Sequence, residues 1–94
     1  MKTVIKGFEK YIQKQTNDKY FGEQTLYKFD NGFGASIIFR PGSYGYEQGL
    51  VELAVIQWLD GTFTLSYNTN LTNDVLGNLN EEQAKLTLQR IKEL

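Results

Sequence analysis

The chain has 94 residues, a net charge of −1, and neither cysteine nor histidine. These absences exclude disulfides, thiolate metal sites and catalytic sites that use a cysteine nucleophile or a histidine base. The lysines are scattered and the carboxylates are not clustered, so neither a DNA-binding face nor a metal site is expected. The apolar content, 40% of the residues, predicts one folded domain over 1–94. Because the residue types and clusters named above are missing, we expect no catalytic residue and no cofactor.

The first predicted element is a helix over Thr3–Gln15. Its apolar residues recur at spacings of three and four, which places them on one face of a helix. They are Val4, Ile5, Phe8, Tyr11 and Ile12. The N-terminus lacks the long apolar segment of a secretion signal, and no run approaches membrane-spanning length. A cytoplasmic protein is therefore expected.

Two segments of alternating pattern flank Asp30-Asn31-Gly32 and predict a β-hairpin: Glu23–Phe29 and Phe33–Phe39. A turn of two residues would mix the apolar and polar faces. A turn of three residues pairs Phe29 with Phe33 and keeps the apolar face continuous. We therefore expect a type I turn with Gly32 left-handed in a G1 bulge.

A second hairpin is predicted around Asp60-Gly61, with strands over Leu50–Leu59 and Thr62–Thr69 and with Trp58 opposite Phe63. An irregular stretch is expected from Asn70 to Leu79. The last helix then begins after Asn80, because this N-cap residue and Gln83 form a capping box. The expected fold class is α+β: a four-stranded, mainly antiparallel sheet of two hairpins, flanked by N- and C-terminal helices in the order αββββα.

The predicted sheet has two faces that both carry apolar residues. The wider face is expected to hold the core, with Tyr27, Phe29, Phe33, Ile37, Phe39, Ile56, Trp58, Phe63, Leu65 and Tyr67. The opposite face carries Leu26, Ile38, Val51, Leu53, Val55 and Leu59. Either a helix covers this second face, or it forms an interface, since large exposed apolar patches usually mark interfaces. The second alternative predicts a homodimer through Leu26, Ile38, Leu53 and Val55.

The segment Arg40–Gly49, between the two hairpins, is the main candidate for function. It holds three glycines, the only proline of the chain and two tyrosines, and long ordered loops often carry binding sites. The expected binding residues are Arg40, Ser43, Tyr44, Tyr46 and Glu47. Alternatively, the loop is structural and its tyrosines cap the edge of the core. Asn73 and Asp74 are a possible polar rim of this site, or turn-capping residues.

Several runs resemble small uncharacterised proteins encoded by tailed bacteriophages. The runs are Leu26–Ile38, Gly42–Gly45, Gly49–Val55 and Thr72–Gly77, so the resemblance extends over about Leu26–Leu79. It implies a phage or prophage accessory protein that acts in the bacterial cytoplasm, and it implies no catalytic residues.

The leading functional hypothesis is a non-enzymatic protein that binds a host or phage protein, for example to antagonise a host defence. The alternative is a protein that binds or sequesters a nucleotide or another small molecule through Arg40 and the amides of the loop. A third possibility is an enzyme that uses Glu47 or Asp74 as its base and Arg40 to stabilise charge. Nucleic acid and membranes are not expected partners.

Overall fold

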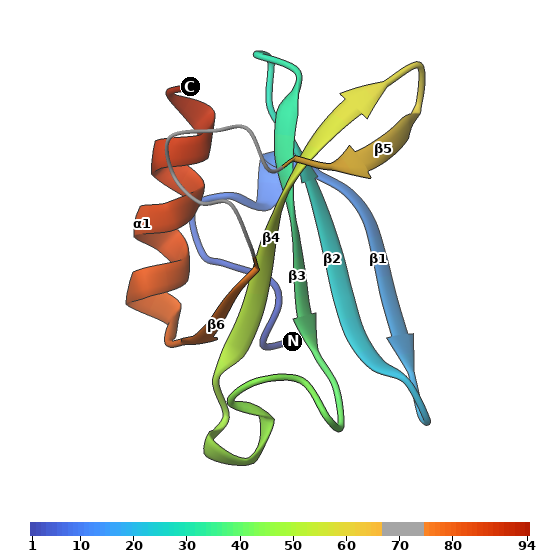
Figure 1. Cartoon of the computed structure of the whole chain (residues 1–94), viewed down its shortest axis with the longest axis vertical. Helices are drawn as coiled ribbons and strands as arrows, with labels where there is room; N and C mark the ends of the chain where they lie inside the picture. Colours follow the sequence, from blue (N-terminus) through green and yellow to red (C-terminus); the bar gives the residue numbers. More distant parts are fainter. Residues whose placement is uncertain (67–74) are drawn as a thin grey trace.

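The computed structural model of the chain describes residues 1–66 and 75–94. Six strands form one curled antiparallel sheet, and a single α-helix lies at the C-terminus (Figure 1). The strand order is β1-β2-β3-β4-β5, and β6 also pairs with β4. The strands are β1 (Ile12–Asp18), β2 (Gly22–Lys28), β3 (Phe33–Phe39), β4 (Val51–Leu59), β5 (Thr62–Leu65) and β6 (Leu76–Leu79). The helices are the 3-10 turns η1 (Glu9–Tyr11) and η2 (Tyr46–Gln48), and α1 (Glu81–Lys92).

The predicted four-stranded sheet with a helix at each end is therefore wrong. Most of the structure is sheet, and the expected helix over Thr3–Gln15 is replaced by turns, η1 and the edge strand β1. Gly7, in the middle of the expected helix, has a φ of 98°, which a right-handed helix does not contain. Ile5 and Phe8 of this segment are buried in the core, but the backbone that carries them is irregular and not helical.

The N-terminal segment is held by buried polar contacts with β2. The hydroxyl of Tyr27 donates a hydrogen bond to the carbonyl oxygen of Thr3 at 2.7 Å and accepts one from the amide of Ile5 at 2.9 Å. The hydroxyls of Thr3 and Thr25 are 2.8 Å apart. The two bonds of the Tyr27 hydroxyl satisfy buried backbone groups of the N-terminal segment. Burial raises the pKa of Tyr27 to about 12, although its hydrogen bond with Ile5 acts in the opposite direction.

The first hairpin has the predicted register. Tyr27 pairs with Ala35, and Thr25 pairs with Ile37. The amide of Phe29 bonds to the carbonyl oxygen of Phe33 at 2.8 Å. Gly32 has a φ of 87°, so the left-handed conformation expected at the end of this turn is confirmed.

Replacing Gly32 with valine is expected to lower the free energy of unfolding by about 1–2 kcal/mol, because a β-branched residue is strained at positive φ. A Cβ atom at this position would meet nothing within 4 Å, so the backbone strain is the whole effect. Urea denaturation measures the loss. Gly32→Asn is the control and should cost less, since asparagine tolerates this conformation. Equal stability of the valine variant and the native protein would contradict the turn geometry.

The second hairpin has the predicted pairing between its strands, but its two faces are exchanged relative to those of the first hairpin. Trp58 pairs with Phe63, as expected. However, β3 and β4 pair with Ala35 opposite Val55, so Val55 and Leu53 share the face of Tyr27. We call this the core face; it packs against α1 and the N-terminal segment. Trp58 and Phe63 lie on the opposite face, which we call the outer face.

The four residues expected to form a dimer interface are therefore split between the two faces. Leu53 and Val55 belong to the core, whereas Leu26 and Ile38 lie on the outer face. The cause is a shift of one residue in the assumed alignment of the two hairpins, which exchanges the faces of every residue in β4. The predicted homodimer thus loses the continuous surface on which it was based.

Strand β4 has two consecutive partners along one edge. Its second half, Ile56–Leu59, pairs with β5, and its first half pairs with β6 through Val51 and Leu53. The strand β6 replaces part of the stretch that was expected to be irregular. Tyr67, which was expected on the wider face, lies outside the described residues.

The C-terminal helix begins as predicted. The side chain of Asn80 accepts a hydrogen bond from the amide of Gln83, and the side chain of Gln83 accepts one from the amide of Asn80. This capping box satisfies two amides at the helix start. The helix buries Ala84, Leu88 and Ile91 against the core face, which also buries Ile5, Phe8, Tyr27, Phe29, Ala35, Ile37, Val51, Leu53 and Val55.

Candidate functional site

Two connections meet at one end of the sheet, the lower end in Figure 1: the β1–β2 turn and the β3–β4 loop. The antiparallel strand order brings them together, because β2 and β3 are neighbours. Their backbones are close: a Cβ atom on Gly22 would lie 2.6 Å from Cβ of Arg40 and from the carbonyl oxygen of Phe39. Only glycine fits this position, so the two connections adjoin where Gly22 meets Arg40.

Local hydrogen bonds and left-handed glycines shape the β3–β4 loop. The hydroxyl of Ser43 donates to the carbonyl oxygen of Arg40 at 2.7 Å and accepts from its amide at 3.2 Å. Gly45 and Gly49, with φ values of 84° and 75°, enclose the single turn of η2. The amide of Leu50 bonds back to Gly45 at 2.9 Å. The loop is therefore an ordered structure that holds its side chains in fixed directions.

The two tyrosines of this loop have different environments. The side chain of Tyr44 is 68% exposed, and its Cβ lies against Gly77 of β6. The ring of Tyr46 is half-buried and packs on Phe39, with ring centroids 4.7 Å apart. Phe39 in turn packs against the core. Tyr46 thus caps the edge of the core, as the structural alternative proposed, whereas Tyr44 is available to a partner.

The β1–β2 turn presents two further exposed aromatic side chains. Tyr20 is 77% exposed and Phe21 is 71% exposed. Asp18 fixes the turn, because its carboxylate accepts hydrogen bonds from the amides of Tyr20 at 2.7 Å and Phe21 at 3.0 Å. The bonds from Phe21 and then Tyr20 lower the pKa of Asp18. We call Tyr20, Phe21 and Tyr44 the aromatic end.

Tyr20 and Phe21 were not identified from the sequence as candidate binding residues. A signal was present: two adjacent aromatic residues stand between Asp18 and Gly22, both of which are typical turn residues.

Arg40 belongs to a different hollow from the rest of the predicted loop site. Its side chain lines a hollow of about 240 Å³ on the outer face, together with Gln24, Ser36, Ile38, Glu52, Ala54 and Val75. Its Nε atom is buried and has no hydrogen-bond partner among the described residues. Ser43, Tyr44, Tyr46 and the exposed Glu47 line a separate hollow of about 350 Å³ along the loop. The structure therefore brings four of the five predicted loop residues together and separates the fifth.

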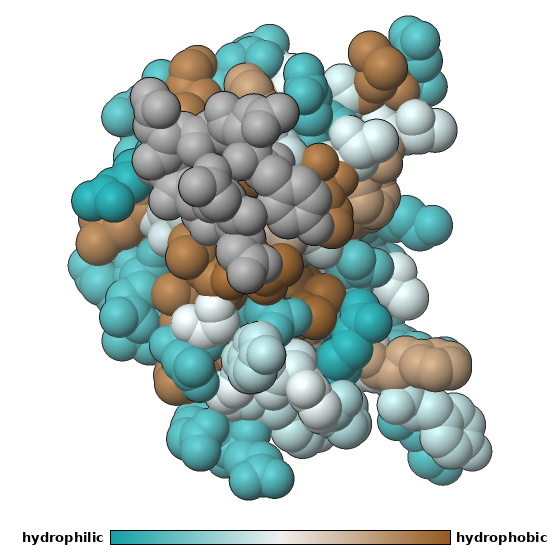
Figure 2. Space-filling view, viewed as in Figure 1, coloured by the Kyte–Doolittle hydropathy of each residue, from teal (hydrophilic) through white to brown (hydrophobic). Residues whose placement is uncertain are grey.

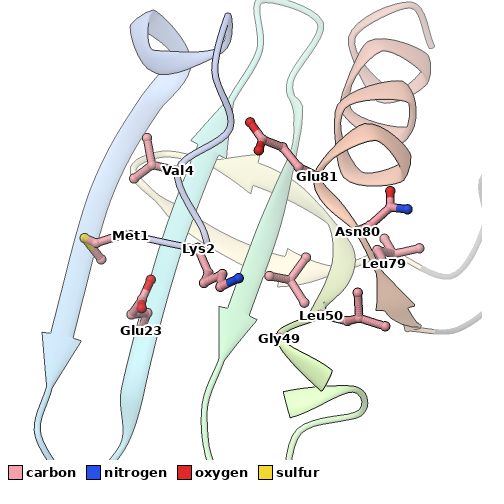
Figure 3. Close-up of a pocket in the computed structure, with 10 residues that line it drawn as sticks. Met1, Lys2, Val4, Glu23, Gly49, Leu50, Leu79, Asn80 and Glu81 are labelled. Carbon is pink, nitrogen blue, oxygen red and sulfur yellow. The ribbon is translucent and has the colours of Figure 1, made fainter. Parts of the chain in front are cut away.

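A hollow of about 510 Å³ lies beside the loop, between the N-terminal segment, the start of β2 and the start of α1 (Figure 3). Lys2 extends between Glu23 and Leu50 in this view. The carboxylate of Glu23 already accepts hydrogen bonds from the amide and hydroxyl of Thr3, both at 3.4 Å. Asn80 is used in the capping box. These polar side chains hold the N-terminal segment and the helix in place.

Asn73 and Asp74, the predicted polar rim, lie outside the described residues. In the described parts of the chain, no cluster of three or more metal-ligating side chains is placed to hold a metal ion. None of the described helices is long and apolar enough to cross a membrane.

No protein-family model, curated protein or solved structure matches this chain. The resemblance to phage proteins therefore stays a prediction.

Proposed function

We propose that the protein is a non-catalytic binding module that recognises a partner protein through its aromatic end. The observation that carries this proposal is the exposure of Tyr20, Phe21 and Tyr44 on two ordered, adjoining connections. Exposed aromatic side chains bring large contact areas at a small cost in conformational entropy, and they are enriched among the residues that dominate interfaces. If the phage resemblance holds, the partner is a host or phage protein in the bacterial cytoplasm.

Both connections are held in shape before a partner arrives. Asp18 fixes the first and Ser43 fixes the second through side-chain hydrogen bonds to the backbone. Ordering a loop on binding weakens the complex, so a preformed surface binds more tightly for the same contacts. Glu47, which is exposed in the same loop as Tyr44, supplies a polar side chain for contacts at the rim.

The geometry does not favour the nucleotide alternative. That hypothesis required the guanidinium of Arg40 and the amides of the loop to converge on one phosphate. Arg40 instead lines the hollow on the outer face, while the loop residues line their own hollow.

Replacing Tyr20, Phe21 and Tyr44 together with alanine is expected to abolish partner binding and to leave the melting temperature nearly unchanged. Exposed side chains usually contribute about 0.5 kcal/mol or less to stability. Aromatic interface residues often contribute more than about 2 kcal/mol each to binding. The alanine at position 44 also keeps the Cβ that lies against Gly77. The partner is captured with the native protein as bait, and titration calorimetry then compares the variants.

Two control variants make this experiment specific. Leu86→Ala removes an apolar side chain that is 57% exposed on α1, and it should bind normally. Tyr46→Ala removes the ring that packs on Phe39, and it should lower the melting temperature. Normal partner binding by the triple variant would show that the aromatic end is not the recognition surface.

A further inference from the structure

A second hollow lies on the outer face, at the other end of β1 from Tyr20. It has a volume of about 430 Å³ and runs between the two edge strands of the curled sheet. Gln13 and Lys14 line it from β1, Leu26 from β2, Trp58 from β4, and Gly61, Thr62 and Phe63 from the β4–β5 turn and β5. Figure 2 shows hydrophobic atoms on the β4–β5 hairpin at the upper right.

Trp58 is held in a fixed position in this hollow. Its indole Nε1 donates a hydrogen bond to the carbonyl oxygen of Tyr27 at 2.8 Å, passing over Gly34. Its ring packs on Phe63 with centroids 5.4 Å apart and planes at 58°. Because the only polar atom of the indole is already satisfied, the remaining exposed surface of Trp58 is apolar. Phe63 is 38% exposed and extends this surface to the edge of the sheet.

Two lysines place positive charge around the apolar surface. Lys14 lines the hollow directly, and Nζ of Lys28 lies 5.9 Å from the ring centroid of Trp58. No carboxylate is among the described residues that line the hollow. Asp60, in the β4–β5 turn, directly precedes the lining residue Gly61 in the sequence. The hollow thus combines an aromatic surface with cationic groups, which complements an apolar group flanked by negative charge.

We propose that this hollow is a second docking site, which binds an acidic peptide segment of a partner protein through one large apolar side chain. The apolar side chain covers Trp58 and Phe63, and the flanking carboxylates approach Lys14 and Lys28. The hollow is open, with Phe63 at its rim, whereas small-molecule sites usually enclose most of their ligand. Among the described strands, β1 and β5 are both edges, so their outer backbone groups also face an extended peptide.

This site is separate from the aromatic end. Lys14 and Asp18 are four residues apart in β1, which is about 13 Å along a strand, and Tyr20 lies beyond Asp18 in the β1–β2 turn. Variants at one surface leave the other intact, so either proposal can fail without the other.

Trp58 is the only tryptophan of the chain, so its fluorescence reports directly on this hollow. The probe is a blocked synthetic peptide, Glu-Glu-Phe-Glu-Glu, titrated into the full-length protein. We expect a saturable change in tryptophan emission and an affinity that falls as salt is added. Peptides with alanine in place of phenylalanine, or with lysine in place of every glutamate, should bind at least about tenfold more weakly.

The variant Lys14→Glu with Lys28→Glu tests the cationic groups and should weaken binding of the acidic peptide by at least about tenfold. Lys6→Glu with Lys85→Glu is the matched control, because it makes the same change in net charge at exposed positions away from the hollow and should leave affinity unchanged. Circular dichroism checks that both double variants are folded.

Four results would overturn the proposal. They are the absence of any response to the acidic peptide, equal binding of the lysine or alanine peptide, and equal loss of affinity in the two double variants. The fourth is a different occupant: an oligothymidylate that binds more tightly than the peptide, or a fluorescence change that follows protein concentration alone. These would assign the hollow to nucleic acid or to a second copy of the chain.

Discussion

Replacing Gly34 with alanine is expected to lower the free energy of unfolding by at least about 3 kcal/mol, which is above the usual cost of an overpacked site. An ideal Cβ on Gly34 would lie 1.9 Å from the carbonyl oxygen of Tyr27 and 2.7 Å from Nε1 of Trp58. The first of these atoms is backbone, so β2 and β3 must separate to admit the methyl group. The hydrogen bond between Trp58 and Tyr27 then breaks as well.

Urea denaturation followed by circular dichroism measures this loss. Gly42→Ala is the control, because a Cβ on Gly42 would meet nothing within 4 Å and only the strain of its φ of 90° remains. A small domain has a total stability of only about 5–15 kcal/mol, so a loss of this size is a large part of it. The Gly34→Ala variant should therefore unfold at a clearly lower urea concentration or fail to fold. A midpoint equal to that of Gly42→Ala would show that Trp58 does not cross β3 at Gly34.

Replacing Tyr27 with phenylalanine is expected to lower the free energy of unfolding by about 2–4 kcal/mol near neutral pH, because two buried backbone groups lose their partner. These groups are the carbonyl oxygen of Thr3 and the amide of Ile5. The ring remains, so the cost comes from the missing hydroxyl. Thermal and urea denaturation measure the loss, and a change below the error of the measurement would mean that the N-terminal segment is not held by Tyr27.

The same hydroxyl predicts an alkaline loss of stability. Its pKa is about 12 in the folded protein, against about 10 for tyrosine in an unfolded chain. Between these values the folded state keeps a proton that the unfolded state has lost. The contribution, about 2–3 kcal/mol, is therefore complete below about pH 10 and disappears as the pH rises to about 12. Tyr27→Phe should show less of this decline, and equal declines in both proteins would contradict the assignment.

Features that depend on neighbouring residues could be predicted from the sequence. The turn at Asp30-Asn31-Gly32 was correct because only one turn length keeps Phe29 and Phe33 in phase. The start of α1 was correct because Asn80 and Gln83 satisfy each other's amides. In both cases the chemistry that decides the structure lies within a few residues.

Features that depend on distant contacts could not be predicted. The spacing of Ile5 and Phe8 fits a helix, yet Tyr27, far away in the sequence, supplies the hydrogen bonds that hold this segment in an irregular form. The face of Trp58 depends on the register between β3 and β4. The long loop between these strands does not fix that register, and a shift of one residue reverses the result.

The candidate site was predictable only where it depends on the local sequence. The composition of the loop indicated exposed contact residues, and Tyr44 and Glu47 are exposed. The position of Tyr20 and Phe21 at the same end of the sheet as this loop follows from the strand order, which pairs β2 with β3 and so brings Gly22 against Arg40. No local sequence pattern predicts this strand order.

Site-specific photo-crosslinking tests the central claim, that the aromatic end recognises a partner protein, most directly. A benzoylphenylalanine residue replaces Tyr20, Tyr44 or, as a control, the exposed Leu86, in cells that express the protein. Positions 20 and 44 should give a crosslink to the same partner protein, and position 86 should not. A partner that crosslinks at position 86 but at neither position of the aromatic end would contradict the account.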